Sequence, residues 1–396
     1  MWVVSTVLAG VLLVLLLGAR TGPWSRDSDA FAEFRSRRYF GGFDGLRAVG
    51  VIAVVWFHVS GPHALAILNH GNKGVDLFFA VSGFLITSLL LREYSAKGGI
   101  DLRAFYLRRT LRIFPLYYLV LGVYCVLVFA TAGGTPRGAQ FWSNLPAFLT
   151  YTSNWFVSLE DSLGGEGVIF YFAWSLATEE QFYLFWPALL MLLLWLTRRL
   201  WTAAIAALLL LGLKVLATGG DVDASLGLLV FSHLAPAILF GAMLAILLHE
   251  KSSFQLLYPV LGRKSMPALA LLVLLACLQL EADRLLTCLV IAVFVASIAL
   301  REDGVLHRAL TCKPAVFVGS ISYGMYLMHM LAANVVRRIV GHATGMDVFI
   351  GTLLLVTVMA YLSFRFFEQP ILRFKDRLKG SAPAAQVPPV NAAGPG

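Results

Sequence analysis

A cation and an imidazole occupy one apolar stretch of this chain, in the segment FDGLRAVGVIAVVWFHVSG. Arg47 and His58 are eleven residues apart, which in a helix is about 20° from a whole number of turns, so both side chains lie on one face. The helical rise separates them by roughly 16 Å, about half the thickness of a hydrocarbon core. Ionisable groups inside a membrane span are costly and indicate function. The pair is therefore interpreted as an anion-binding arginine at one membrane surface and a general base near the midplane.

A basic cluster occurs in the segment YLRRTLRIFPLYY. Arg108, Arg109 and Arg112 are spaced by three and four residues, which places them on one side of a helical turn. Pro115 suits the first turn of a following helix, whose free N–H groups attract anions. The preceding segment, 94–113, is expected to lie along the membrane surface. Because guanidinium groups match phosphate in a bidentate geometry, the cluster predicts a phosphate site. Contact with anionic lipids is the alternative.

A carboxylate occurs inside the apolar segment WSLATEEQFYLFWP. Glu179 and Tyr183 are one turn apart and share a face. A helix that enters the membrane near residue 173 places Glu179 roughly 9 Å inside it. A buried carboxylate needs a partner, and His58 or an arginine is expected. A structural polar contact between helices is the alternative.

Four weaker candidates are interpreted as support for the site or as acceptor contacts. Asp76 and Ser82 occur in GNKGVDLFFAVSGFLI, and His329 occurs in SYGMYLMH. Asp44 lies three residues before Arg47, near the membrane boundary. Each has a simpler interpretation, as a hydrogen-bonded core group or as the partner of a neighbouring charge.

The composition predicts an all-α polytopic membrane protein that positions these residues. Hydrophobic residues make up 59% of the 396 positions and charged residues 13%, and the mean hydropathy is +0.79; this excludes an ordinary soluble domain. A weaker apolar stretch, 145–158, is expected to be re-entrant or interfacial. About eleven transmembrane helices are predicted, near 1–19, 46–66, 74–93, 114–132, 173–197, 201–217, 225–248, 266–281, 285–300, 315–337 and 346–367.

The basic residues indicate the orientation of the chain in the cell membrane. The net charge of +9 is concentrated in loops on one side, which places the N-terminus outside and the C-terminus in the cytoplasm. No nucleic-acid partner is expected, and no spacing predicts a metal site. Three regions are predicted: an N-terminal transmembrane helix and connector over 1–39, a membrane domain over 40–372, and a disordered cytoplasmic tail over 373–396.

Six segments, in this order, resemble the acyltransferase 3 family of integral membrane acyltransferases. They are FDGLRAVGVIAVVWFH, GNKGVDLFFAVSGFLI, FYLRRTLRIFPLYY, WSLATEEQFYLFWP, ISYGMYLMH and FRFFEQP. The resemblance implies a core of ten helices, here preceded by one more. It also implies an acyl-CoA donor, usually acetyl-CoA, used from the cytoplasmic side, and transfer to a hydroxyl of an extracytoplasmic carbohydrate or glycosylated acceptor of the cell envelope. The family's motifs fall on Arg47 and His58, on Arg108, Arg109 and Arg112, and on Glu179.

These observations lead to one mechanism and two alternatives. The donor phosphates are expected at Arg109 and Arg112, with Arg47 assisting. His58 is expected to act as general base near the thioester, and Glu179 to orient the imidazole. The first alternative is a proton-coupled transporter or flippase of an anionic or glycosylated solute, although no inverted repeat is visible. The second, a membrane scaffold, leaves the intramembrane polar groups unexplained.

Overall fold

Every regular element in the described part of the protein is helical, so the all-α prediction is confirmed. The computed structural model describes residues 25–37, 39–61, 63–158, 167–219 and 230–378. The helix expected over 1–19 and the tail from 379 onward lie outside these residues. The elements are α2 (Ser25–Ser36), α3 (Gly42–Val59), α4 (Ala66–Asn69), α5 (Lys73–Lys97), α6 (Leu102–Ala132), α7 (Pro136–Leu149), α8 (Ser153–Phe156), α9 (Ala173–Thr197), α10 (Leu200–Gly219), α12 (Pro236–His249), α13 (Lys251–Leu261), α14 (Met266–Gln279), α15 (Arg284–Leu300), α16 (His307–Leu310), α17 (Lys313–Val340), α18 (Met346–Ser363), the π-helix η2 (Phe364–Glu368) and α19 (Gln369–Leu378).

The long apolar helices indicate a multi-pass membrane protein. Within the described residues, six helices are long and apolar enough to cross a membrane: α3, α5, α6, α9, α17, and α18 with its continuation to Arg373. A seventh span results if α12 and α13, between which the chain bends by 110°, are counted together as one span. The helices α10, α14 and α15 are apolar but shorter. The predicted number of eleven spans is therefore not confirmed.

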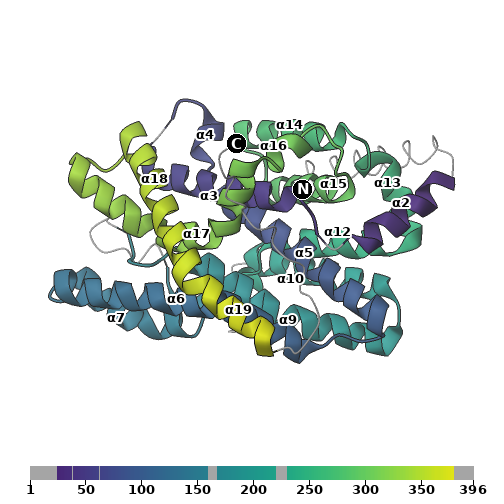
Figure 1. Ribbon diagram of the computed structural model, residues 1–396, viewed down its shortest axis with the longest axis horizontal. Coiled ribbons are helices and arrows are strands. Elements are labelled where there is room, and N and C mark those ends of the chain that lie inside the picture. The colour runs from purple at the N-terminus through teal and green to yellow at the C-terminus, as the bar shows by residue number, and fades with distance from the viewer. Residues whose placement is uncertain (1–24, 38, 62, 159–166, 220–229, 379–396) are drawn as a thin grey trace, which may run out of the picture.

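Close backbone contact holds α5 against α12 in the core of the molecule (Figure 1). A Cβ atom added at Gly83 would lie 2.0 Å from the carbonyl oxygen of Ile238, and one at Gly241 would lie 2.3 Å from that of Ala80. Small residues permit this approach, as in many membrane helix pairs. Any larger side chain at either position would push the two helices apart.

The helices α3 and α17 run in the same direction and pack closely. A Cβ atom at Gly319 would lie 2.0 Å from the carbonyl oxygen of Asp44 near the start of α3. At the other end, the amide N–H of Gly345, beyond α17, donates to the carbonyl of Val59 at 2.9 Å. The two helices therefore stay together over the length of α3, which brings their polar residues to one interface.

The helix α6 is continuous through Pro115, which corrects the predicted break. The side chain of Asp101 caps α6 by accepting from the amide of Ala104 at 2.9 Å, and the helix continues for 31 residues to Ala132. A proline is tolerated inside a membrane helix because neighbouring groups can satisfy the freed carbonyl. The segment 102–113 is thus the first part of the continuous helix α6, and its position along the membrane surface stays a prediction.

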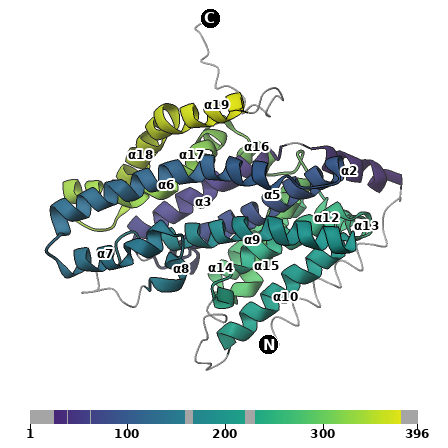
Figure 2. The same ribbon diagram turned by 90° about the horizontal axis from the view of Figure 1, so that it is seen from below.

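The helix α7 turns back along α6 (Figure 2). The hydroxyl of Tyr117 donates to the carbonyl of Phe148 at 2.8 Å, and that of Tyr118 to the carbonyl of Leu149 at 2.9 Å. Neither α7 nor α8 is long enough to be a candidate span, so the stretch 145–158 does not span by itself, and its re-entrant or interfacial position stays a prediction. Farther along the chain, η2 and α19 continue α18 and lie against α6 (Figure 1).

Candidate active site

Two imidazoles face each other between α3 and α17. The ring centroids of His58 and His329 are 4.9 Å apart; His58 is half-buried and His329 is fully buried. Nδ1 of His58 lies 2.9 Å from the carbonyl oxygen of Val54, and Nδ1 of His329 lies 2.5 Å from that of Tyr326. Since a carbonyl only accepts, each Nδ1 carries a proton and each Nε2 offers a lone pair. His58 can therefore take a proton through Nε2.

The sequence indicated that His58 lies near the middle of its helix, but the structure places it at the end. The apolar run extends to residue 66, but α3 ends at Val59 and His58 is its penultimate residue. It is about 24 Å from Gly42 by helical rise. Arg337 of α17 holds this end, because its Nη2 donates to the carbonyl of His58 at 2.7 Å.

A buried hydrogen-bonded group at the start of α9 lies beside the imidazole of His329. The hydroxyls of Ser175 and Tyr326 are 2.5 Å apart, and Tyr326 also contacts the carbonyl of Phe172 at 3.1 Å. The Phe172 ring lies 5.2 Å from that of His329, edge to face. Among the described residues, Nε2 of His329 has no hydrogen-bond partner. A buried nitrogen without a partner is available to a ligand or to the neighbouring imidazole.

Glu179 lies one turn deeper along α9 than Ser175, and its partners are not those expected. Its carboxylate accepts hydrogen bonds from Ser82 of α5 and from Tyr183, one turn along α9. The guanidinium of Arg109 stacks 4.7 Å from the centre of the Tyr183 ring. Within the described residues, the structure thus brings Glu179 to a serine and a tyrosine beside an arginine, and it does not pair this carboxylate with His58.

Three of the four predicted arginines come together at the other end of α3. Arg112 lies within electrostatic range of Arg47, Arg109, Asp44 and Glu368. Its side chain is exposed, while Arg47 and Arg109 are half-buried. Arg109 and Arg112 lie roughly 10 and 15 Å along α6 from its first residue. Because like charges repel when they are brought together, this cluster favours an anionic ligand.

Carboxylates flank the arginine cluster. Oδ1 of Asp44 lies 3.1 Å from Nη1 of Arg47, and the hydroxyl of Tyr39 donates to the same carboxylate. Burial and the Asp44 carboxylate raise the pKa of Tyr39, which precedes α3, so its hydroxyl stays a donor. On the other side, Glu368 of η2 accepts from Ser363 at 3.3 Å. These carboxylates reduce the repulsion among the arginines.

Together these residues form a series of polar groups, here called the polar line. Its two ends are the arginine cluster and the imidazole pair, and between them Tyr326 lies within electrostatic range of Glu179 without contacting it. The polar line consists of Arg47, Arg112, Arg109, Tyr183, Glu179, Tyr326, His329 and His58.

Two predicted site residues lie away from the polar line. Arg108 points toward α5, where its Nη2 is 3.9 Å from the carboxylate of Glu93. Asp76, in the first turn of α5, is 3.3 Å from Lys73 and 4.0 Å from Arg284. Both make ion pairs that connect or terminate helices. Their geometry supports the simpler, structural interpretation of each.

Several residues of the site carried weaker sequence signals. Glu180 lies within electrostatic range of Glu179, Arg109 and Tyr151, and a second carboxylate inside an apolar helix was a visible signal. The direction in which Glu180 points could not be predicted, because consecutive helical residues are about 100° apart and face different neighbours. Tyr326 had only its place in SYGMYLMH, since its partner Ser175 is distant in the sequence.

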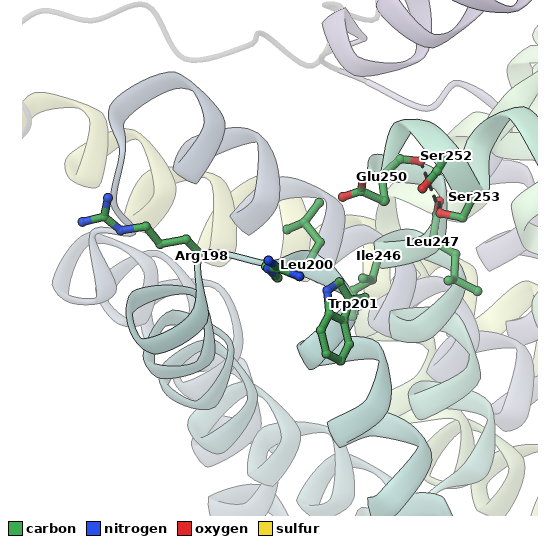
Figure 3. Close-up of a pocket in the computed structure, with 9 residues that line it drawn as sticks. Arg198, Leu200, Trp201, Ile246, Leu247, Glu250, Ser252 and Ser253 are labelled. Carbon is green, nitrogen blue, oxygen red and sulfur yellow. Dashed lines mark hydrogen bonds between the residues drawn. The ribbon is translucent and has the colours of Figure 1, made fainter.

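The larger of the two cavities noted in the described part of the protein lies elsewhere. It measures about 480 Å³ and is found where α9 meets α10 and α12 bends into α13. Figure 3 shows Trp201 on one side of it and Glu250 and Ser253 on the other. Its lining includes no residue of the polar line. The candidate site therefore rests on side-chain chemistry and not on cavity size.

Comparison with known proteins agrees with the resemblance in the motifs. The family model described as an acyltransferase domain, that of acyltransferase 3, matches residues 40–365. The O-acetyltransferase OatA of Staphylococcus aureus strain NCTC 8325 is 30% identical over 365 residues, which are 88% of this chain and 59% of OatA. SACOL0978 of Staphylococcus aureus strain COL is 27% identical over 361 residues, which are 86% of this chain and 58% of that protein. The chain thus spans somewhat less than 60% of these relatives, and no solved structure matches it.

Proposed function

Because the chain belongs to the acyltransferase 3 family, we propose that it transfers an acetyl group from acetyl-CoA to a hydroxyl of an extracytoplasmic carbohydrate or glycosylated acceptor. The observation that carries the proposal is the imidazole pair: Nδ1 of His58 is held by a carbonyl, which leaves Nε2 to accept a proton. The polar line has this base at one end and, at the other, an arginine cluster suited to phosphates.

The arginine cluster is proposed to bind the phosphates of the donor. Arg47, Arg109 and Arg112 present guanidinium donors that match phosphate oxygens, and the exposed side chain of Arg112 is accessible to a ligand. The uncharged pantetheine arm would follow the polar line, over the roughly 16 Å between Arg47 and His58. In the proposed orientation the arginine end faces the cytoplasm, where acyl-CoA is made, and the imidazole end faces outside.

The proposed reaction is direct transfer with His58 as general base. Nε2 of His58 takes the proton of the acceptor hydroxyl while its oxygen attacks the thioester carbonyl carbon. The carbon–sulfur bond then breaks, and the imidazolium returns its proton to the thiolate, which leaves as free CoA. The ring of His329 packs beside the imidazole of His58 and stabilises its position. Glu179 is proposed to act indirectly, by fixing Tyr183 and, through the ring of Tyr183, the position of Arg109.

The test is acetyl transfer by the protein in phosphatidylcholine nanodiscs. With radiolabelled acetyl-CoA and an extract of cell-envelope glycans, the wild type is expected to label glycan and release CoA. His58→Ala is expected to lose about 10²- to 10⁴-fold in turnover, the usual contribution of a general base. A His58→Ala protein that folds normally and keeps near-wild-type turnover would contradict the mechanism.

A matched control is available five residues farther along the chain. His63 stacks on Trp56 at 4.7 Å and hydrogen-bonds Ser60, so it is a histidine of the same region outside the polar line. His63→Ala is expected to retain turnover within about twofold. A transporter would release no CoA in a preparation without compartments, so release of CoA separates the two classes.

A further inference from the structure

The cavity of about 480 Å³ at the junction of α9, α10, α12 and α13 holds charged groups that the polar line does not use. Its lining combines Arg199, Glu250 and Ser253 with the indole of Trp201 and with apolar side chains such as Ile246. A volume within about 300–1,000 Å³ and a few polar groups among apolar ones are typical of a site for a small ligand. We call this cavity the α9–α13 pocket.

Two opposite charges line the α9–α13 pocket without a protein partner. Within the described residues, the guanidinium of Arg199 and the carboxylate of Glu250 make no ion pair and no hydrogen bond. Glu250 directly precedes α13, yet its side chain does not cap that helix. Figure 3 shows the guanidinium of Arg198 pointing away from Glu250 and Ser253, so the positive charge of the pocket comes from Arg199.

Neutral polar groups complete the lining. The indole N–H of Trp201 has no hydrogen-bond partner in the part of the chain that the structure describes. The hydroxyl of Ser253 donates to the carbonyls of Leu247 and Glu250 at 2.5 and 3.3 Å, so its oxygen can only accept from a ligand. The pocket thus offers the donors of Arg199 and Trp201 to an anionic group, and the oxygens of Glu250 and Ser253 to a cationic group.

An exposed apolar face of α10 begins at the pocket. Its members are spaced by three, four and four residues with one neighbour, which places them on one side of the helix; they are Trp201, Ile205, Leu208, Leu209 and Leu213. Ala203 and Ala207, on the other side of α10, are buried. In a chain with several candidate membrane spans, a continuous exposed apolar face is a surface for lipid chains.

The residues around the connection between α9 and α10 are those of a membrane boundary. The helix α9 is a candidate span that ends at Thr197, and α10 begins at Leu200. Trp195 and Trp201, both exposed, flank the pair Arg198 and Arg199. Tryptophan and basic residues gather where a span meets the water. We therefore expect the α9–α13 pocket at the level of the phospholipid headgroups.

We propose that the α9–α13 pocket binds the headgroup of phosphatidylethanolamine. The phosphate lies at Arg199, the ammonium group at Glu250, and the acyl chains along the exposed face of α10. The balance of charges favours this zwitterion, because an anionic headgroup would leave Glu250 unpaired and a choline headgroup has no N–H to donate to it. The lipid would link the connection between α9 and α10 to the bend between α12 and α13. This proposal does not depend on the proposed function.

The test is a lipid titration of the delipidated protein, followed by native mass spectrometry. The wild type is expected to bind phosphatidylethanolamine about two- to fivefold more tightly than phosphatidylcholine with the same acyl chains, in the range of a partly exposed charge pair. Phosphatidylglycerol is expected to bind more weakly than phosphatidylethanolamine. Soluble phosphoethanolamine has the same polar groups and no acyl chain, so an equal concentration should displace little of the bound lipid.

Glu250→Gln is expected to remove the preference, because the neutral amide keeps the shape of the side chain and loses the charge that attracts the ammonium group. Arg199→Ala is expected to weaken phosphatidylethanolamine and phosphatidylcholine about equally, since both carry the phosphate. The matched controls are Glu302→Gln and Arg103→Ala, two exposed positions outside the pocket and the polar line. Both should bind the lipids as the wild type does.

The comparison of lipids on the wild type needs no variant, so it decides the proposal even where a substitution disturbs folding. Equal affinity for phosphatidylethanolamine and phosphatidylcholine would overturn the proposal, as would a preference that survives Glu250→Gln. Tighter binding of phosphatidylglycerol would overturn the zwitterion. Displacement of the lipid by an equal concentration of phosphoethanolamine would overturn the lipid as the source of the headgroup.

Discussion

Two regions of the molecule use the same residue types for different purposes. In the region where α2 packs on α5 and α12, Arg92 donates to the carbonyls of Arg37 and Phe34 and lies 4.7 Å from the Phe40 ring. His249 of α12 has its Nδ1 2.7 Å from a carbonyl of the preceding turn, and its ring packs 5.1 Å from that of Phe34. The polar line likewise contains an arginine over an aromatic ring and histidines bonded to helix carbonyls.

The difference between the regions is what remains available to a ligand. The guanidinium of Arg92 is occupied by backbone carbonyls and aromatic rings, whereas Arg112 is exposed among other cations. His249 is buried against a phenyl ring, whereas His58 is half-buried and faces a second imidazole. A motif that contains arginine and histidine is therefore not enough to define a site. Exposure to a ligand and the neighbouring imidazole define it, because Nε of Arg92 and Nε2 of His249 also lack a hydrogen-bond partner within the described residues.

The largest expected contrast is between the two arginines. Arg112→Ala is expected to weaken acetyl-CoA binding about 10- to 100-fold, since a charged hydrogen bond contributes about 1.5–3 kcal/mol. Arg92→Ala is expected to leave donor affinity unchanged and to lower the unfolding temperature, because it leaves two carbonyls without their donor. In the same nanodiscs, isothermal titration measures the affinity for acetyl-CoA and thermal unfolding measures the unfolding temperature of each variant. If Arg92→Ala weakened donor binding as much as Arg112→Ala, the comparison would fail.

An intermediate effect is expected for the buried histidines. His329→Ala is expected to lower kcat about 10-fold, less than the loss of the base itself, with the KM for acetyl-CoA unchanged because the arginine cluster is intact. His249→Ala, the matched buried histidine, should change stability and leave kcat near the wild-type value. Steady-state kinetics on folded protein measure kcat and the KM for acetyl-CoA of both variants. Equal losses of kcat would mean that His329 contributes only packing.

The smallest effect is expected where the structure places a carboxylate beside the arginine cluster. Glu368→Gln removes a charge that attracts Arg112, so acetyl-CoA should bind about two- to fivefold more tightly, in the range of a partly exposed charge pair. Glu302→Gln, an exposed position outside the polar line, is the control and should change nothing. Weaker binding by Glu368→Gln would instead show that this carboxylate positions Arg112 for the ligand.

Helical periodicity predicted the contents of the site better than its pairings. It placed Tyr183 on the face of Glu179, and the two are hydrogen-bonded. It did not predict that Ser82, 97 residues away, would be the second partner of Glu179. The predicted break at Pro115 was wrong because local preference treats proline as a helix start, whereas a long membrane helix accommodates it.

The sequence by itself determined that this chain is helical, crosses a membrane and belongs to a family of acyltransferases. Those properties follow from local quantities: hydropathy, the helical repeat and short motifs such as the one that ends in His58. Only the tertiary structure decided which polar residues meet. His58 faces His329 because α3 and α17 pack in parallel through Gly319, and Arg112 joins Arg47 because α6 continues through Pro115. A contact between helices depends on how side chains from distant segments fit together, and no repeat within one segment encodes it.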